Sequence, residues 1–314
     1  QWPGVVAPDR LARTMRRGPG SQPTLDARSN GDEPMQRLAR WVVLGVITAA
    51  TAAVFVVRTL LAHVGEPPRL FDLFTVITVL GALCVLIAER GRLRGTDWLA
   101  AVAAGLFVAC TMPFTTLFTP YPFWGVVGDR VGQGALRGVL VGVAALGALA
   151  MMRRGGPVQT SVAAGDLGKA ARSLIIGAVI GLPLAVLNMF ANSWTQSRAF
   201  VWQSMPAAAL DALQPALFEE IVFRFAFLGL LWLPLRPFWG ARAIWPAGAL
   251  AFLVHTYAHY DELFVSQPVV ALIMGAALAV IWGLPMTVLA VRRDLESAIG
   301  FHWVQDALRF WAGL

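Results

Sequence analysis

The sequence predicts an all-α fold, a polytopic membrane helical bundle of about eight to nine transmembrane helices. Hydrophobic residues make up 57% of the 314 residues and charged residues only 14%, and the mean hydropathy is +0.65. A soluble domain is about a quarter charged, so this composition indicates a chain that is largely embedded in lipid. Its apolar stretches also reach the length of roughly 20 residues that a bilayer-spanning helix requires.

Nine apolar stretches are candidates for these helices. They lie at approximately residues 41–63, 70–88, 98–118, 136–152, 174–194, 207–235, 243–260, 266–291 and 295–313. The stretch that begins at Trp41 is longer than the roughly 7–15-residue core of a signal peptide, so we expect it to remain as an anchor. Pro113 interrupts the 98–118 stretch near its end, and this span is therefore expected to be the least regular.

The residues before the first span differ in composition from the rest of the chain. They are rich in Arg, Pro, Gly and Ser and show no periodicity, so we expect residues 1–38 to form a disordered tail, with Met35 as a candidate native start. The remainder divides into N-terminal transmembrane helices, a cytoplasmic loop and a C-terminal core, at residues 39–155, 156–173 and 174–314.

The net charge of +7 comes almost entirely from arginine, because Lys169 is the only lysine. With the N-terminus inside, the outer loops carry only Arg69, Arg130 and Arg198, whereas the loops on the inner side carry Arg90, Arg92, Arg94, Arg153, Arg154, Lys169, Arg172, Arg236, Arg242, Arg292 and Arg293. This asymmetry predicts a cytoplasmic N-terminus. No basic stripe alternates with aromatic residues on a polar surface, which argues against nucleic-acid binding. The arginine-rich, lysine-poor composition is typical of a high-GC bacterium, so we expect a bacterial plasma membrane.

Cysteines and small residues are expected to serve packing. Cys84 and Cys110 lie in apolar stretches, so we expect two buried thiols. The sequence contains no Cys-x-x-Cys pair, which excludes a zinc ribbon or redox motif. Glycines recur at the small-xxx-small spacing that lets membrane helices approach closely, at Gly134, Gly138, Gly142, Gly177 and Gly181.

Three ionisable residues interrupt the apolar run from Pro215 to Trp232 in the sixth stretch: Glu219, Glu220 and Arg224. Each costs roughly 2.5–3.5 kcal/mol at membrane depth on insertion scales, so such residues need partners and usually mark function. One helical turn separates Glu220 from Arg224, which predicts an ion pair. Glu219 points about 100° away from Glu220 on a helix of roughly 3.6 residues per turn, which leaves its carboxylate for another partner.

Two later apolar stretches carry polar residues at the same one-turn spacing. His255 and His259 share one face of a helix, and so do His302 and Asp306. Three of the four histidines of the chain thus fall on two helices of its C-terminal third. Their proximity to the glutamate helix favours a shared site over isolated core histidines.

Taken in order, these elements resemble the motifs of the CPBP family. The elements are Glu-Glu-x-x-x-Arg at 219–224, a histidine on the next helix, and His-x-x-x-Asp at 302–306. That family includes the type II CAAX prenyl endopeptidases and bacterial bacteriocin-processing and self-immunity proteins. The resemblance covers about residues 174–314, and the run from Arg292 to His302 is similar to the family's approach to its last motif.

Two positions depart from the family pattern. A phenylalanine usually stands four residues before the second-motif histidine, where this chain has Ala251 before His255. His259 has His255 at that position, so we favour His255 and keep His259 as the alternative. Asp306 stands where the family commonly has Asn, and an ionised carboxylate accepts hydrogen bonds but cannot donate one.

The resemblance implies an intramembrane endopeptidase that hydrolyses peptide bonds of membrane-associated proteins or peptides with a glutamate-activated water. Glu219 is the implied base, and His255 is expected to hold the water. Glu220 and Arg224 are expected to form an orienting ion pair, because removing either partner would leave a buried charge unpaired. The implied partners are the lipid bilayer and a peptide or protein substrate.

The last motif supplies the remaining site residues. His302 is expected to donate to the developing oxyanion, and Asp306 to fix the tautomer of that histidine or a neighbouring water. A zinc-dependent version of the same hydrolase would use ligand types that catalytic zinc prefers, at Glu219, His255, His302 and Asp306. The chain lacks the His-Glu-x-x-His motif of soluble zinc proteases, so we favour no metal and no other cofactor.

Two alternatives outside the enzymes stay open. Buried ionisable residues also form proton relays in transporters, although the two halves of this chain show no convincing inverted repeat. A non-catalytic bacteriocin-immunity protein or membrane partner could keep the same charge pair for stability. Glu219→Gln distinguishes these classes, because a scaffold should tolerate the loss of a base that a hydrolase requires.

Overall fold

The computed structural model describes residues 32–118, 122–195 and 197–314, and these are helical apart from loops and one isolated bridge between Phe123 and Val127. The first helices are α1 (Asp32–Leu61), α2 (Leu70–Glu89), α3 (Gly95–Thr111), α4 (Arg130–Arg153) and α5 (Leu167–Thr195). The later helices are α6 (Met205–Glu219), α7 (Leu228–Trp239), α8 (Ile244–Tyr257), α9 (Asp261–Ser266), α10 (Pro268–Leu278), α11 (Leu284–Arg292) and α12 (Leu295–Trp311).

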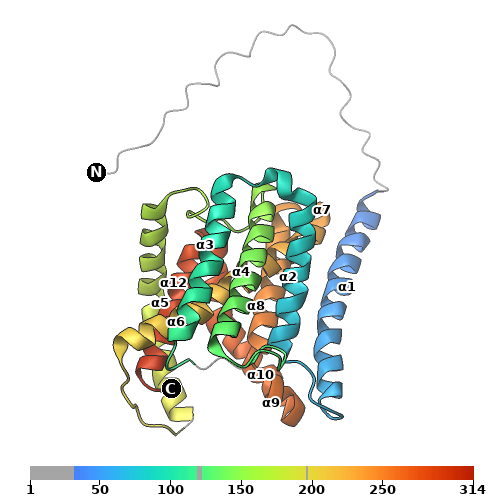
Figure 1. Cartoon of the computed structure of the whole chain (residues 1–314). Helices are drawn as coiled ribbons and strands as arrows, with labels where there is room; N and C mark the ends of the chain where they lie inside the picture. The colour runs from blue at the N-terminus through green and yellow to red at the C-terminus, as the bar shows by residue number, and fades with distance from the viewer. Residues whose placement is uncertain (1–31, 119–121, 196) are drawn as a thin grey trace, which may run out of the picture.

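Two π-helical segments join helices into longer rods. The segment Glu220–Phe227 runs without a break from α6 into α7, and Ala279–Gly283 joins α10 to α11. The rods stand roughly parallel in a bundle, with α1 at its side (Figure 1). Short 3₁₀ turns close the helix ends at residues 90–92, 112–114 and 240–243.

The all-α membrane fold predicted from the sequence is confirmed. Six described segments are long and apolar enough to cross a bilayer: Arg37–Leu61, Leu70–Arg92, Gly95–Phe114, Arg130–Arg153, Leu167–Thr195 and Pro268–Arg292. The other three predicted stretches are helical as well. Residues 205–239 form the rod that carries the charged residues, and α8 and α12 have 14 and 17 residues.

Two local predictions are wrong. Helix α1 begins at Asp32, so residues 32–38 are helical, while the predictions for residues 1–31 lie outside the described part of the chain. Cys84 and Cys110 are exposed on α2 and α3 instead of buried. In lipid the outer surface of a bundle is as apolar as its core, so an apolar stretch does not indicate which of its residues are buried.

The glycine pattern marks two close helix pairs. A Cβ at Gly138 would meet the carbonyl oxygen of Gly105, which joins α4 to α3, and a Cβ at Gly177 would collide with the backbone of Ser297 in α12. Gly300 of α12 likewise touches the backbone of Leu174 in α5. The α5–α12 contact therefore depends on glycine on both sides, and it positions the helix that carries His302 and Asp306.

We expect Gly177→Val to destabilise the protein by about 1–3 kcal/mol, because the added side chain must force α5 away from α12. Gly142→Ala is the matched control, since a Cβ there has only ordinary contact with Ala101 at 3.8 Å. Thermal unfolding of both variants in the same detergent measures the difference. Equal melting temperatures of Gly177→Val and Gly142→Ala would contradict this account of the α5–α12 contact.

Polar contacts tie several loops together at one end of the bundle, which we call the arginine-rich end. Arg153 at the end of α4 pairs with Asp97 of α3 at 2.5 Å, and Arg154 pairs with Glu89 of α2 at 2.9 Å. Arg236 of α7 donates to the carbonyl of Arg154 at 3.1 Å. The chain just before α12 joins the same end, since the nitrogen of Leu295 donates to the carbonyl of Gln159 at 2.9 Å.

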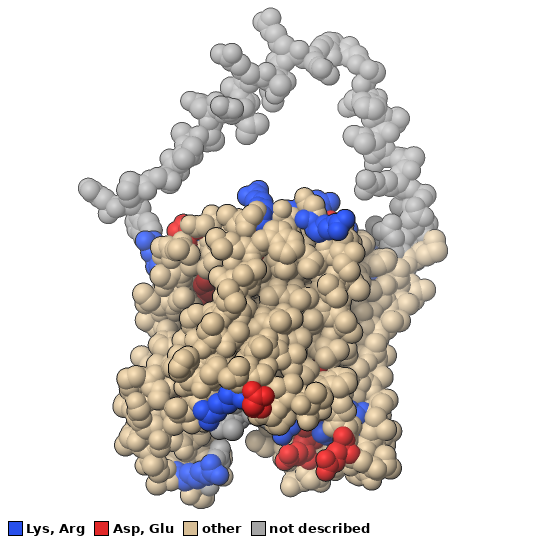
Figure 2. All heavy atoms as spheres, viewed as in Figure 1, with Lys and Arg blue, Asp and Glu red and all other residues tan. Residues whose placement is uncertain are grey.

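The opposite end is held by Asp261, which is buried at the start of α9. Its carboxylate accepts from the nitrogen of Leu70 at 2.8 Å and pairs with Arg58 of α1 at 3.2 Å. Basic side chains outnumber acidic ones at the upper end of a largely uncharged surface, while acidic and basic side chains mix at the lower end (Figure 2).

Candidate active site

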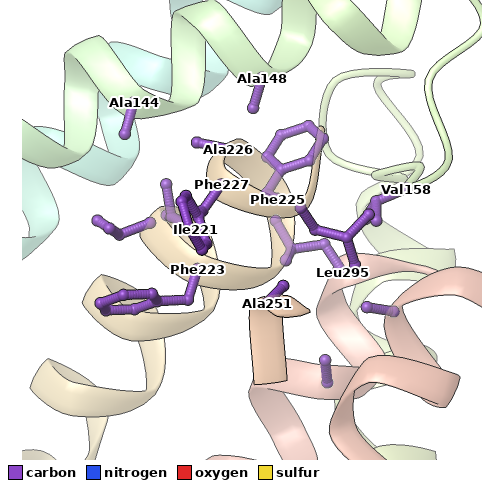
Figure 3. Close-up of a cluster of buried hydrophobic side chains, with 14 of the residues drawn as sticks. Ala144, Ala148, Val158, Ile221, Phe223, Phe225, Ala226, Phe227, Ala251 and Leu295 are labelled. Carbon is purple, nitrogen blue, oxygen red and sulfur yellow. The ribbon is translucent and has the colours of Figure 1, made fainter. Parts of the chain in front are cut away.

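The site is built on the π-helical segment that follows Glu219. All of its residues are buried, and their side chains pack against neighbouring helices (Figure 3). Phe223, Phe225 and Phe227 pack there against alanines of α4 and α8 and against Leu295 of α12. Helical segments with i→i+5 hydrogen bonding are rare and frequently occur at functional sites.

Glu220 links the glutamate helix to the last helix. Its Oε1 lies 3.0 Å from Nη1 of Arg224 and 2.8 Å from Nδ1 of His302. Glu220 and Arg224 are both completely buried. The ion pair expected from the four-residue spacing is therefore present, and Glu220 also holds the imidazole of His302, a contact that the sequence did not indicate.

Arg224 depends on Glu220 for charge compensation. Within the described part of the chain, none of its guanidinium nitrogens makes a well-aligned hydrogen bond, and the contact with Glu220 is an ion pair. Removing Glu220 would therefore leave the buried charge of Arg224 without a partner, and an unpaired buried charge strongly destabilises a folded protein.

Glu219 is the point on which three histidines converge. Its Oε2 lies 2.6 Å from Nε2 of His255, 3.6 Å from Nε2 of His259 and 3.8 Å from Nε2 of His302. The carboxylate that was predicted to be free for another partner thus faces imidazoles from α8, from the turn after it, and from α12. His255 and His259 were weighed as alternatives, and both lie at the site.

Asp306 lies beside the other nitrogen of His302. Its Oδ2 is 3.4 Å from Nε2 of His302, and its Oδ1 pairs with Nη2 of Arg309 at 2.9 Å. Glu220 contacts Nδ1 of the same imidazole, so two carboxylates flank His302, whereas the sequence analysis considered only Asp306, as the residue that fixes the tautomer or a neighbouring water.

The cap of α12 sets the position of His302 and Asp306 along the bundle. Asp294 precedes α12 and accepts from the nitrogen of Ser297 at 3.0 Å, which satisfies a free donor at the helix start. Its other carboxylate oxygen accepts from the hydroxyl of Ser173 on α5 at 2.6 Å. One side chain therefore both begins α12 and ties it to α5.

Aromatic rings form one wall of the site. Phe223 lies 4.6 Å from the ring of His255, and Phe71, at the start of α2, lies 5.4 Å from the ring of His259. The sequence did not point to Phe71, since nothing in a lone phenylalanine at the start of a distant apolar stretch indicates this contact. His259, by contrast, carried a signal in its spacing from His255.

The donor atoms fit a metal ion, with a different ligand set from the one expected. Glu219, His255 and His259 each offer a ligand atom, and these atoms lie within 4.8 Å of one another. Histidine nitrogens and a carboxylate oxygen are ligands that catalytic zinc uses. This group contains His259 and does not contain His302 or Asp306, which the sequence analysis included in a zinc-dependent alternative.

A buried carboxylate surrounded by histidines inside a helical membrane bundle is the kind of site that an intramembrane hydrolase requires. Residues 201–308 match the family model described as type II CAAX prenyl endopeptidase Rce1-like. The matched segment contains Glu219 to Asp306, and the match supports the resemblance to the CPBP family that the order of the motifs indicates. No curated protein and no solved structure matches the chain.

Proposed function

We propose that this protein is an intramembrane endopeptidase that hydrolyses peptide bonds of membrane-associated proteins with water activated by Glu219. The observation that carries the proposal is the convergence of three histidine nitrogens on Oε2 of Glu219, at 2.6, 3.6 and 3.8 Å. The match to a protease family over this segment supports a hydrolytic role for the cluster. A bacterial plasma membrane with the N-terminus in the cytoplasm is the setting we propose.

His255 orients the base in this mechanism. Its Nε2 lies 2.6 Å from Glu219, so an Nε2–H donates to the carboxylate and fixes its direction. Glu219 then removes a proton from a water molecule, and the resulting hydroxide attacks the carbonyl carbon of the scissile peptide bond. General-base assistance of this kind contributes about 10²–10⁴-fold to a rate.

His302 stabilises the charge that develops on the carbonyl oxygen. Glu220 accepts from Nδ1–H of His302, which leaves Nε2–H of the imidazolium to donate to the oxyanion. Asp306 faces the same nitrogen and accepts from it before substrate binds. The proton held by Glu219 then passes to the leaving amine, the C–N bond breaks, and Glu219 is regenerated as a carboxylate.

Peptide N-termini from cells test the proposal. Host-like bacterial cells would express either the wild-type protein or Glu219→Gln at matched levels, and we expect N-termini that are present with the wild-type protein and missing with the variant. These termini would also identify the substrates. If both proteins insert equally and their terminal peptides are the same, the protease function is refuted.

A zinc-dependent hydrolase is the second candidate, because Glu219, His255 and His259 bring their ligand atoms within 4.8 Å. A zinc ion held by these residues would supply Lewis-acid activation of water. In that case Glu219 would serve as a ligand, and the base would be a different group.

His259→Ala separates the two mechanisms. In the metal-free mechanism we expect turnover to fall by less than about 10-fold, because His259 is half-exposed and lies 3.6 Å from Glu219. Cleavage assays with and without a chelator, together with the zinc content of the purified protein, make the comparison. Loss of turnover in His259→Ala, together with stoichiometric zinc in the wild-type protein, would favour the zinc enzyme instead.

The non-enzymatic candidates predict different results. A proton-coupled transporter would show proton-dependent uptake into liposomes that Glu219→Gln abolishes, with no new peptide termini. A bacteriocin-immunity protein or membrane partner would keep its protective effect in Glu219→Gln, because the buried pair of Glu220 and Arg224 would be intact.

A further inference from the structure

The glutamate cluster is open on one side. The side chain of His259 is 47% exposed, whereas those of Glu219, His255 and His302 are 12%, 5% and 10% exposed. Asp306, the other carboxylate near His302, is 11% exposed. The exposed side of the cluster is therefore the side on which His259 lies.

The position of His259 in the chain shows at which end of the bundle the cluster is exposed. This residue follows the last residue of α8, Tyr257, and precedes Asp261, the first residue of α9. Asp261 binds the nitrogen of Leu70 at the start of α2 and pairs with Arg58 near the end of α1. These helix termini lie opposite the arginine-rich end, where α2 ends and α8 begins (Figure 1).

The path from the arginine-rich end is filled by packed side chains. Beyond Glu219 the π-helical segment places Phe225 against Val158 of the α4–α5 loop and Leu295 of α12 (Figure 3). A cavity of about 100 Å³ enters near that end between α3, α4 and α12, and Ile221 and Phe225 are among the residues that line it. None of the histidines or Glu219 lines this cavity.

The loops at the arginine-rich end carry an excess of positive charge. They hold 11 of the 20 basic residues in the described part of the chain, in the stretches 90–94, 153–172, 236–242 and 292–293. Excess arginine and lysine in short loops sets the cytoplasmic side of a helical membrane protein. The end that exposes His259 then faces the other side of the membrane.

We propose that the glutamate site opens to the extracytoplasmic face, so that its substrates are extracytoplasmic segments of membrane-anchored proteins, next to their membrane spans. The assignment of substrates rests on the proposed protease function. The direction of access rests only on the exposure of His259 and on the distribution of basic loops.

Single-cysteine labelling tests the direction of access without requiring catalysis. Cys84 and Cys110 would be replaced by alanine, and His259→Cys, Glu262→Cys and Arg92→Cys would each be introduced into the full-length protein. Glu262 is exposed beside His259, and Arg92 is exposed at the arginine-rich end. Intact bacterial cells would be treated with a membrane-impermeant maleimide, before and after permeabilisation, and labelling after denaturation would confirm that each cysteine is present.

We expect His259→Cys and Glu262→Cys to be labelled in intact cells as completely as in permeabilised cells, and Arg92→Cys only after permeabilisation. The reverse pattern would overturn the proposal, because access would then be cytoplasmic. Labelling of Glu262→Cys in intact cells without labelling of folded His259→Cys would also overturn it, because the site would not open at that end. If labelling agrees but Glu219-dependent peptide termini are missing, only the protease function fails.

Discussion

Arg224→Met is expected to lower the free energy of unfolding by about 3–5 kcal/mol, the cost of leaving one member of a buried ion pair without its partner. Glu220 and Arg224 are completely buried, with their charged atoms 3.0 Å apart. Without the guanidinium, the carboxylate of Glu220 retains only His302 as a close polar partner among the residues that the structure describes. Thermal unfolding in detergent, followed together with the monodisperse fraction after purification, measures the loss.

The double variant Glu220→Gln/Arg224→Met is the control for this prediction. It removes both charges at once, so we expect it to be more stable than Arg224→Met alone, as replacement of a whole buried pair is often neutral. It should nevertheless hydrolyse slowly, because His302 loses the carboxylate at Nδ1. An Arg224→Met protein as stable as the wild type would show that the pair does not hold this part of the bundle.

His302→Gln is expected to reduce kcat by about 10²–10³-fold, the usual effect of removing one oxyanion donor. The effect should appear in kcat and leave KM nearly unchanged, since the contact with the oxyanion is made only in the transition state. Trp303→Phe, one residue further along α12, is the matched control. Its indole donates to the carbonyl of Ala209 at 2.8 Å, a contact with no atom of the site.

Cleavage rates of the purified variants, measured over a range of substrate concentrations, separate kcat from KM. An unchanged kcat in His302→Gln would remove His302 from the mechanism. If kcat falls as much in Trp303→Phe as in His302→Gln, the position of α12 limits the rate and the imidazole does not.

The sequence predicted contacts within a single helix and missed those between helices. The four-residue spacing of Glu220 and Arg224 predicted their ion pair, and the pair forms although the segment is π-helical, because residues four apart remain on one face of the wider turn. The contact of Glu220 with His302 joins residues 82 positions apart. Its formation depends on how α12 packs against the glutamate helix, which no local pattern encodes.

The histidines show where a motif and the geometry differ. The family pattern favoured His255 over His259, and the structure places both close to Glu219. Helix α8 ends at Tyr257, so His259 reaches the site from the turn after the helix. The motif spacing predicts the position of His255, which lies in the helix. It does not predict the position of His259, which lies in the turn after the helix.

Burial was predicted least well, and the lipid environment explains why. Cys84 and Cys110 are exposed although their surroundings are apolar, and Asp261 is buried although it follows a helix end. Hydrophobicity separates inside from outside in water, but in a bilayer both the core and the lipid-facing surface are apolar. Asp261 is buried because its carboxylate accepts from the nitrogen of Leu70 and forms an ion pair with Arg58, and these partners are 191 and 203 residues away in sequence.

The central claim is that Glu219 is the base that activates water, and the most direct test is the cleavage rate of the purified protein in liposomes. A substrate peptide identified from cellular N-termini would be offered to wild-type protein and to Glu219→Gln, both shown to be folded and both treated with a chelator. We predict that the wild-type protein cleaves the peptide and that the variant is slower by about 10²–10⁴-fold. A Glu219→Gln protein that cleaves at the wild-type rate would contradict the claim.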